Sequence, residues 1–506
     1  MKKSLLCSLF ILWATIGFAQ KTTLTVSLAN SKAEEFSLLD TRQIFENEFA
    51  ESTAMEVKLN KKKSGCLSLD LKRAGFFDLR CLGRTDREYL FYNLYIEPGN
   101  HLNIRVDFDR PDFGITVIGS GAENNQPLIA LIKKPFDVHE FYGDTTPVRV
   151  ISAIKKEEIK QQQNFDNYVR KYKPTKRFIS DWQLNQKYFA AKTYFSFKEN
   201  NKFKIQDSYI KGTKSGWEKI QDSLIDEKSI NNEQAVYTPN YLRLIQEFLL
   251  RKKEKLWMMA SIEPENFFPE WYNMDQKEGM IAYSDDSTNL LKEKIINKYF
   301  SGQSAEILYM TLFDDAINEA YYKNVPQIFE RFKYRFPKSR YINWIKPYVE
   351  AYLIREQKPL NDKMIIAKNN GSDLNTFEEI LAAYKGKTML LDMWGTWCGP
   401  CRSEIETNGQ AIKDHFKGRG IDYLYIANHD QSNEADWKKL IPYFNMEGFH
   451  ILANLKLTKD IMQKVKGDGF PTYVIIKRDG SYELSKAGFP MNREILIKQL
   501  EEALTH

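Results

Sequence analysis

Two cysteines separated by two residues form the most reactive pattern in this chain of 506 residues. They lie in the segment Trp397-Cys398-Gly399-Pro400-Cys401, after an apolar run and before a stretch with helical spacing. Unpaired amides and the dipole at a helix start stabilise a thiolate, so Cys398 is the expected nucleophile. Cys401 would lie in the first turn, within bonding range, and would resolve the mixed disulfide that Cys398 forms. The spacing therefore predicts a dithiol–disulfide couple.

A Cys-x-x-Cys pair also occurs in zinc sites, which need two further ligands at metal spacing. The chain has five cysteines and six histidines, but no second Cys-x-x-Cys and no His-x3–5-His pair. We therefore expect redox chemistry without a bound metal or other cofactor. Pro400 suits an early helical position and stiffens the motif.

Alternating strand and helix patterns surround the two cysteines. After a boundary near residues 362–376, the patterns predict strands over 388–391, 422–427 and 473–476, and helices after Cys398, over 437–444 and over 493–503. Such alternation is typical of an α/β layer with a largely parallel centre.

The segment Leu391–Arg402, which reads LDMWGTWCGPCR, and the later GFPTY at 469–473 resemble the thioredoxin-like family. Within it the chain is most similar to the exported TlpA/ResA-like branch of thiol–disulfide oxidoreductases. The resemblance covers about residues 375–506 and implies a C-terminal thioredoxin fold. The regions before it look more loosely like the extensions that precede such domains in some envelope proteins.

The resemblance implies a client-binding face. Pro471 stands where the family has a cis-proline beside the dithiol. The backbone at Phe470 and Pro471 would pair with an extended client peptide as an added strand. Trp397, Gly399 and Pro400 are expected to contact the same client.

The resemblance also implies two acids. Asp392 occupies the position of the family's buried acid, which passes protons to or from Cys401 through water. Glu404 matches an acid of the ResA-like branch that tunes the cysteines. The alternatives are a structural aspartate in a polar network and a solvated glutamate on a helix surface.

Two positions depart from the family pattern. Glu406 stands where many relatives have a proline, which puts the usual helix kink in doubt. The lysine that many cytoplasmic thioredoxins carry near the buried acid has no evident counterpart around residues 428–430. His429 in that loop is interpreted as a surface residue, since it has no evident partner.

Residues 20–120 are predicted to form an N-terminal antiparallel, sandwich-like β domain. Apolar and polar residues alternate over 24–28, 67–71 and 102–106, with turn residues at 97–100. A turn at 73–74 would make 67–71 and 76–80 a hairpin and place Cys66 opposite Cys81, within disulfide reach. Two buried free thiols remain the alternative, because cysteine also packs as a small hydrophobe.

Residues 121–365 are predicted to form an α-helical middle domain, and residues 366–506 the thioredoxin-like domain. Aromatic residues recur at helical spacing in the middle domain, for example Phe178, Trp182 and Phe189. Such stripes are interpreted as buried helix faces. No fixed repeat period is present, and the region indicates no chemistry.

Residues 1–19 have the pattern of a secretory signal peptide. Lys2 and Lys3 precede an apolar stretch, and Gly17 and Ala19 suit a cleavage site. The stretch is short for a spanning helix, although an uncleaved anchor is the alternative. Cys7 would be removed with the signal. We therefore expect an exported protein of the periplasm or cell envelope, with no spanning helix after cleavage.

The composition is that of a folded, multidomain protein. Hydrophobic residues make up 42% and charged residues 28%, which excludes disordered, collagen-like and coiled-coil chains. A net charge of +6 is mild for this length and gives no reason to expect a nucleic-acid partner.

We expect an exported oxidoreductase that reduces disulfides of client proteins, because Gly-Pro between the cysteines is typical of strongly reducing thioredoxins. Such a reductant would need electrons from a membrane donor. One alternative is a thiol peroxidase, although residues 391–397 lack the proline of the Pro-x3-Thr-x2-Cys pattern. Another is a binding or assembly module of the cell envelope with an accessory redox domain.

Overall fold

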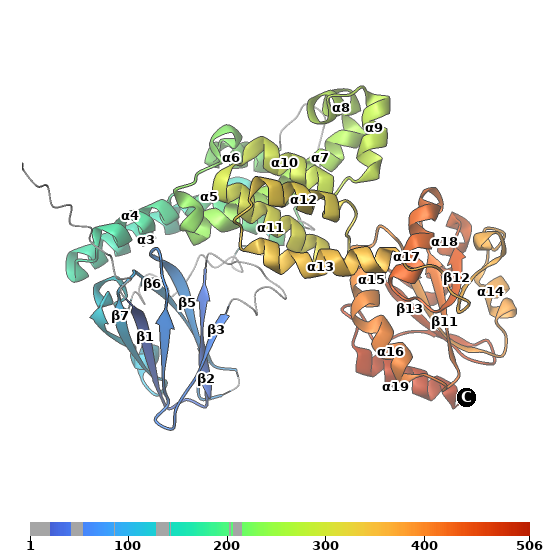
Figure 1. The fold of residues 1–506 in the computed structure, drawn as a ribbon, viewed down its shortest axis with the longest axis horizontal. Coiled ribbons are helices and arrows are strands. Elements are labelled where there is room, and N and C mark those ends of the chain that lie inside the picture. Colours follow the sequence, from blue (N-terminus) through green and yellow to red (C-terminus); the bar gives the residue numbers. More distant parts are fainter. Residues whose placement is uncertain are drawn as a thin grey trace, which may run out of the picture. The chain divides into compact units, whose positions relative to one another are not determined.

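The computed structural model describes residues 21–41, 54–85, 87–127, 141, 143–201, 204–205 and 215–505. The predicted signal peptide, with Cys7, lies outside these residues. Figure 1 shows strands first, then helices, then a C-terminal α/β layer. The described residues fall into two compact units: a first unit up to Met280 with Lys294–Leu308, and a second unit of Ile281–Glu293 and everything from Tyr309 onward. The domain boundaries expected from the sequence stay predictions.

Two four-stranded sheets form the β part of the first unit, with strand orders β4-β1-β7-β8 and β3-β2-β5-β6. Alternate side chains of both sheets point into one shared apolar core, as expected for a sandwich. However, β1 pairs with β7 in parallel, so the expectation of a purely antiparallel domain is wrong at this pair. The strands are β1 Thr22–Ala29, β2 Glu35–Asp40, β3 Ala54–Lys58, β4 Ser64–Leu69, β5 Gly75–Leu82, β6 Tyr89–Ile96, β7 His101–Asp107 and β8 Thr116–Ser120.

The predicted hairpin and its disulfide are wrong. Cys66 lies on β4, which pairs with β1, whereas Cys81 lies on β5, which pairs with β2 and β6 in the other sheet. Both cysteines are free, Cys66 exposed and Cys81 buried, and burial raises the pKa of the Cys81 thiol to about 12. The segment between β4 and β5 crosses from one sheet to the other. The alternation of apolar and polar residues is the same whether two strands form a hairpin or join different sheets. The sequence pattern therefore cannot distinguish the two connections.

Helices follow the sandwich, and their aromatic stripes are buried as expected. In the first unit, α3 and α4 place Phe165, Phe178 and Trp182 against Tyr95 of β6, with the Phe165 and Trp182 rings stacked at 3.6 Å. None of the described helices is long and apolar enough to cross a membrane. These helices are α3 Pro147–Tyr172, α4 Lys176–Gln186, α5 Phe189–Asn200, α6 Gly216–Leu224, α7 Pro239–Ile262, α8 Pro264–Tyr272, α9 Gln276–Asp285, α10 Asn289–Tyr299, α11 Gly302–Asn318, α12 Val325–Arg335 and α13 Tyr341–Glu356.

The C-terminal layer, orange to red in Figure 1, is a six-stranded sheet of order β14-β13-β10-β11-β12-β9. Strand β10 is buried along its whole length and pairs in parallel with β11 and antiparallel with β13. Helices α14 and α18 cover one face, and α16 and α19 cover the other. The predicted strands and helices of this layer are confirmed. They are β9 Met364–Ile366, α14 Phe377–Ala383, β10 Thr388–Trp394, α15 Gly399–Glu404, α16 Gln410–His415, β11 Ile421–Ala427, α17 Glu434–Tyr443, β12 Gly448–Leu452, α18 Leu455–Val465, β13 Thr472–Ile476, β14 Tyr482–Leu484 and α19 Arg493–Leu504.

Candidate active site

The two cysteines of the Cys-x-x-Cys motif lie where β10 passes into α15. Cys398 caps the helix: its Sγ accepts a hydrogen bond from the Cys401 amide at 3.1 Å. A disulfide joins the two residues, whose Cα atoms are 5.3 Å apart, and both are buried. The predictions that Cys398 begins a helix and that Cys401 lies within bonding range are confirmed. The helix start provides the amides and the dipole that stabilise a thiolate on Cys398.

The loop before Cys398 is fixed by the loop after β11. The buried carboxylate of Asp430 accepts hydrogen bonds from the amide and hydroxyl of Thr396, at 2.7 and 2.5 Å. The indole Nε1 of Trp397 donates to the Asn428 carbonyl oxygen at 2.8 Å. These bonds join the loop before the dithiol to the loop after β11.

Aromatic residues surround the exposed side of the motif. The side chain of Trp397 is 50% exposed, and its ring lies 5.7 Å from that of Phe470, nearly perpendicular. The Phe470–Pro471 peptide bond is cis, as expected for this position. His429 is exposed, as interpreted, but its ring lies 6.1 and 6.2 Å from the two aromatic rings. The histidine therefore borders the site.

Asp392 lies on β10 beneath the dithiol motif and is 5% exposed. Its Oδ1 is buried and makes no hydrogen bond within the described part of the chain. Burial, helped by the charge of Glu404 and opposed by that of Lys413, raises the pKa of this carboxyl to about 8. A satisfied structural aspartate would accept hydrogen bonds at both oxygens, so that alternative fits poorly.

Glu404 is buried at 7% exposure, so the alternative of a solvated glutamate is wrong. Its carboxylate accepts hydrogen bonds from Asn408 Nδ2 at 2.6 Å and from the Met491 amide at 2.9 Å. A cavity of about 30 Å³ lies between Glu404 and Asp392, lined also by Tyr425 and Tyr473 among others. A cavity of this size and polarity has room for water.

A π-helical turn at Ile405–Gly409 separates α15 from α16, in the region where Glu406 replaces the proline of many relatives. The helix is therefore interrupted at this point although Glu406 stands in place of the proline. Glu406 forms an ion pair with Arg355 of α13.

Sequence reasoning missed Lys413 on α16. Its Nζ donates to the Asn445 carbonyl oxygen at 2.6 Å and lies 5.6 Å from the centre of the Tyr425 ring. Burial lowers the pKa of Lys413 to about 8, against the opposing charges of Glu447 and Asp392. The positive charge that acts on the buried acid thus comes from a helix and not from the loop at 428–430. A lysine on a helix is usually solvated, so no pattern in the sequence distinguishes this one.

Comparisons with known proteins agree with this geometry. A family model described as Redoxin matches residues 361–494. The thiol–disulfide oxidoreductase ResA of Bacillus subtilis is 39% identical over 100 residues, 20% of this chain and 52% of ResA. ResA of Geobacillus kaustophilus is 34% identical over 132 residues, 26% of this chain and 71% of that protein. The chain spans about half the length of the Bacillus relative.

Among solved structures, the thioredoxin domain of a thiol–disulfide oxidoreductase from Bacteroides vulgatus is 24% identical over 24% of this chain and 82% of that chain, with a TM-score of 0.21.

A dithiol at a helix start, a cis-proline beside it and a buried acid beneath it define the thioredoxin-like class of redox domain. Through residues 361–494 the chain belongs to the TlpA/ResA-like branch of that class.

Proposed function

We propose that this protein is an exported thiol–disulfide oxidoreductase that reduces disulfides in client proteins. The observation that supports the proposal most directly is the bonded pair of Cys398 and Cys401 at the start of α15. Exposed Trp397 and the backbone at Pro471 would hold the client strand beside it. Gly399 and Pro400 would contribute the short turn between the two sulfurs. A thiol peroxidase and an assembly module have no comparable support.

Two exchange steps carry the electrons. The Cys398 thiolate attacks one sulfur of the client disulfide, which breaks that bond, forms a Cys398–client disulfide and releases the other client sulfur as a thiolate. The Cys401 thiolate then attacks Cys398 Sγ, which closes the bond seen here and releases the second client thiolate. Two electrons pass from the dithiol to the client.

Asp392 would serve as the proton acceptor for Cys401. A carboxyl with a pKa of about 8 is populated in both protonation states near neutral pH, as a group that exchanges protons requires. Water in the cavity that Asp392 and Glu404 line would exchange protons with the carboxyl. Glu404 and Lys413 set the charge around it. We further propose export to the cell envelope, with a membrane protein supplying electrons to restore the dithiol.

The direction of electron flow can be tested by equilibrating the protein with glutathione buffers of known potential. We expect the Cys398–Cys401 couple to be reducing, because Gly-Pro separates the cysteines as in thioredoxin, near −270 mV. A measured potential above about −180 mV would exclude the reductant role.

The clients can be captured with Cys401→Ser. This variant retains the attacking thiol but cannot resolve the mixed disulfide, so clients should stay attached to Cys398. Mass spectrometry of the adducts should find the linkage at Cys398. Adducts at Cys66, the exposed free thiol of the sandwich, in place of Cys398 would contradict the assignment of the nucleophile.

A further inference from the structure

The loop between α11 and α12 lies directly beside the dithiol turn, within the second unit. Arg402 Nε donates a hydrogen bond to the Glu319 carbonyl oxygen at 3.1 Å, and its guanidinium lies 4.8 Å from the centre of the Tyr321 ring. A Cβ placed on Gly399 would be 3.6 Å from Cβ, Cγ and Oε2 of Glu319. The Glu319 side chain therefore stands next to the residue that follows Cys398.

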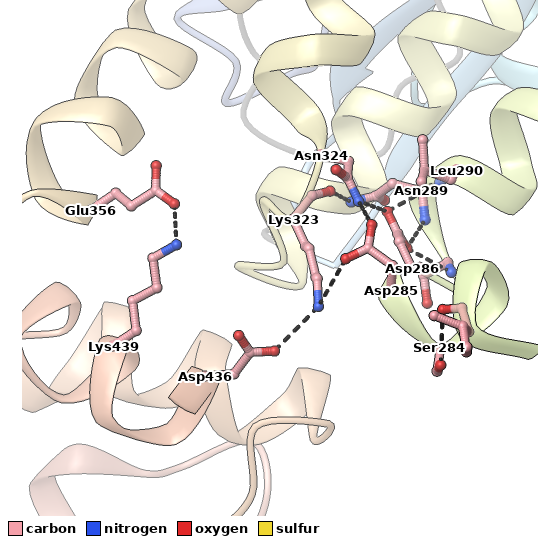
Figure 2. A network of polar contacts seen from close by, with 12 residues as sticks. Ser284, Asp285, Asp286, Asn289, Leu290, Lys323, Asn324, Glu356, Asp436 and Lys439 are labelled. Atoms are coloured by element: carbon pink, nitrogen blue, oxygen red, sulfur yellow. Dashed lines mark hydrogen bonds and ion pairs between the residues drawn. The ribbon is translucent and has the colours of Figure 1, made fainter. Parts of the chain in front are cut away.

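Polar contacts on both sides fix this loop, as Figure 2 shows. The fully buried Asn289 donates through Nδ2 to the carbonyl oxygens of Tyr321 and Lys323, at 2.9 and 2.8 Å. Lys323 Nζ lies 3.2 Å from a carboxylate oxygen of Asp436 on α17 and 3.7 Å from one of Asp285. The loop is thus bound both to Asp285 of α9 and Asn289 of α10 and to the thioredoxin-like layer.

The loop backbone is also unusual. Ala320 has φ of 46° and is 3% exposed. Residues with a Cβ rarely adopt this left-handed region. Such conformations persist where the surrounding structure fixes them, and they concentrate at functional sites. This conformation lies between Glu319 and Tyr321, the two residues that contact the dithiol motif.

Helix α13, in the same unit, is also held against this layer. Glu356 at the end of α13 pairs with Lys439 of α17, as Figure 2 shows, and Arg355 pairs with Glu406. The ring of Tyr352 lies 5.2 Å from that of Tyr322 and 5.7 Å from that of Tyr443. The loop between α11 and α12 therefore forms one wall of the dithiol site.

The loop presents one exposed carboxylate, that of Glu319, beside the dithiol turn. Arg402 is 3% exposed, and it donates to the carbonyl oxygens of Thr396 and Glu319. Burial lowers the pKa of Arg402, against the opposing effects of Glu319, Tyr321 and Asp430. The Glu319 side chain is exposed to solvent. A client that reaches Cys398 would thus meet both aromatic rings and a carboxylate.

We propose that Glu319 selects client disulfides whose attacked cysteine is flanked by lysine or arginine. The inference rests on the proposed function, because it concerns which disulfides Cys398 attacks. A carboxylate beside the dithiol attracts a basic neighbour of the client cysteine and repels an acidic one, and specificity arises from the difference between the two.

The test compares two peptides that share one intramolecular disulfide and carry either lysine or glutamate beside the cysteines. The readout is the ratio of kcat/KM for the lysine peptide to that for the glutamate peptide, measured with the full chain. We expect a ratio of about five in the unmodified protein, which falls towards one in E319Q and inverts in E319K. High salt should reduce the preference, since screening weakens exposed charge pairs.

Two controls separate selection from a structural effect. E319D should keep the preference, because the carboxylate remains. E330Q and E330K change an exposed glutamate of α12 whose side chain is 70% exposed, and they should keep the original ratio. An unchanged ratio in E319K would overturn the inference alone. If the unmodified protein reduced neither of the two peptides, the proposed function and the inference would be overturned together.

Discussion

Cys398→Ser is expected to abolish disulfide reduction, with kcat/KM for a protein disulfide falling at least about a thousandfold. A serine hydroxyl at the start of α15 is not ionised at neutral pH and cannot attack a sulfur as a thiolate does. Cys401 cannot substitute, because it lies inside the first turn with no exposed area, whereas Cys398 is the N-cap residue and is 3% exposed. The measurement is reduction of insulin, with the dithiol regenerated by an excess of a chemical reductant.

Cys66→Ser is the matched control, since it removes an exposed free thiol from β4 of the sandwich. It should retain full activity. If Cys398→Ser reduced insulin at the rate of the unmodified protein, Cys398 would not be the nucleophile. If Cys66→Ser were the inactive variant, the site would lie in the sandwich.

Asp392→Asn is expected to stabilise the oxidised thioredoxin-like domain in a pH-dependent manner. The carboxyl has a pKa of about 8 in the folded protein and 3.8 as the reference value, so the folded state binds its proton more tightly. Stability therefore falls as the pH rises from about 4 to 8, when the unfolded chain is ionised and the folded one is not. At pH 7 the buried carboxyl lowers the free energy of unfolding by about 4 kcal/mol relative to its contribution at low pH. An uncharged asparagine avoids this loss.

Pulsed hydrogen exchange of β10 peptides across a urea series would measure this local stability. The difference between variant and parent should be near zero at pH 4 and grow with pH. Asp422→Asn, on the neighbouring strand β11, changes an aspartate whose side chain is 44% exposed and should show no such growth. A pH-independent difference at Asp392 would show that its carboxyl ionises freely in the folded protein.

The sequence predicted those parts of the site that depend on neighbouring residues. Cys398 and Cys401 were identifiable because the strand, the turn and the helix that position them are contiguous in the sequence. Pro471 was identifiable because the motif that contains it is also a short contiguous segment. The strands of the α/β layer were identifiable because a fully buried strand such as β10 is a continuous apolar run.

The parts that the sequence did not predict depend on contacts between residues that are far apart along the chain. The alternation around Cys66 and Cys81 specifies two strands but not which sheet each one joins. Lys413 has the local appearance of a solvated helix residue and Glu319 that of a solvated loop residue, and only the folded chain brings them to Asp392 and Gly399. The burial of Glu404 likewise depends on contacts with Met491, far along the chain.

The π-helical turn at Ile405–Gly409 has a consequence for engineering this domain. Each residue of an α-helix advances about 100° around its axis, so a wider turn changes the angular phase of everything that follows it. The phase set in this turn determines which side of α16 carries Lys413 towards the buried acid. A redox motif transplanted together with a turn of ordinary α-helical width would arrive out of phase with α16. The exchangeable module is therefore the whole stretch from β10 through α16, not the four residues around the sulfurs.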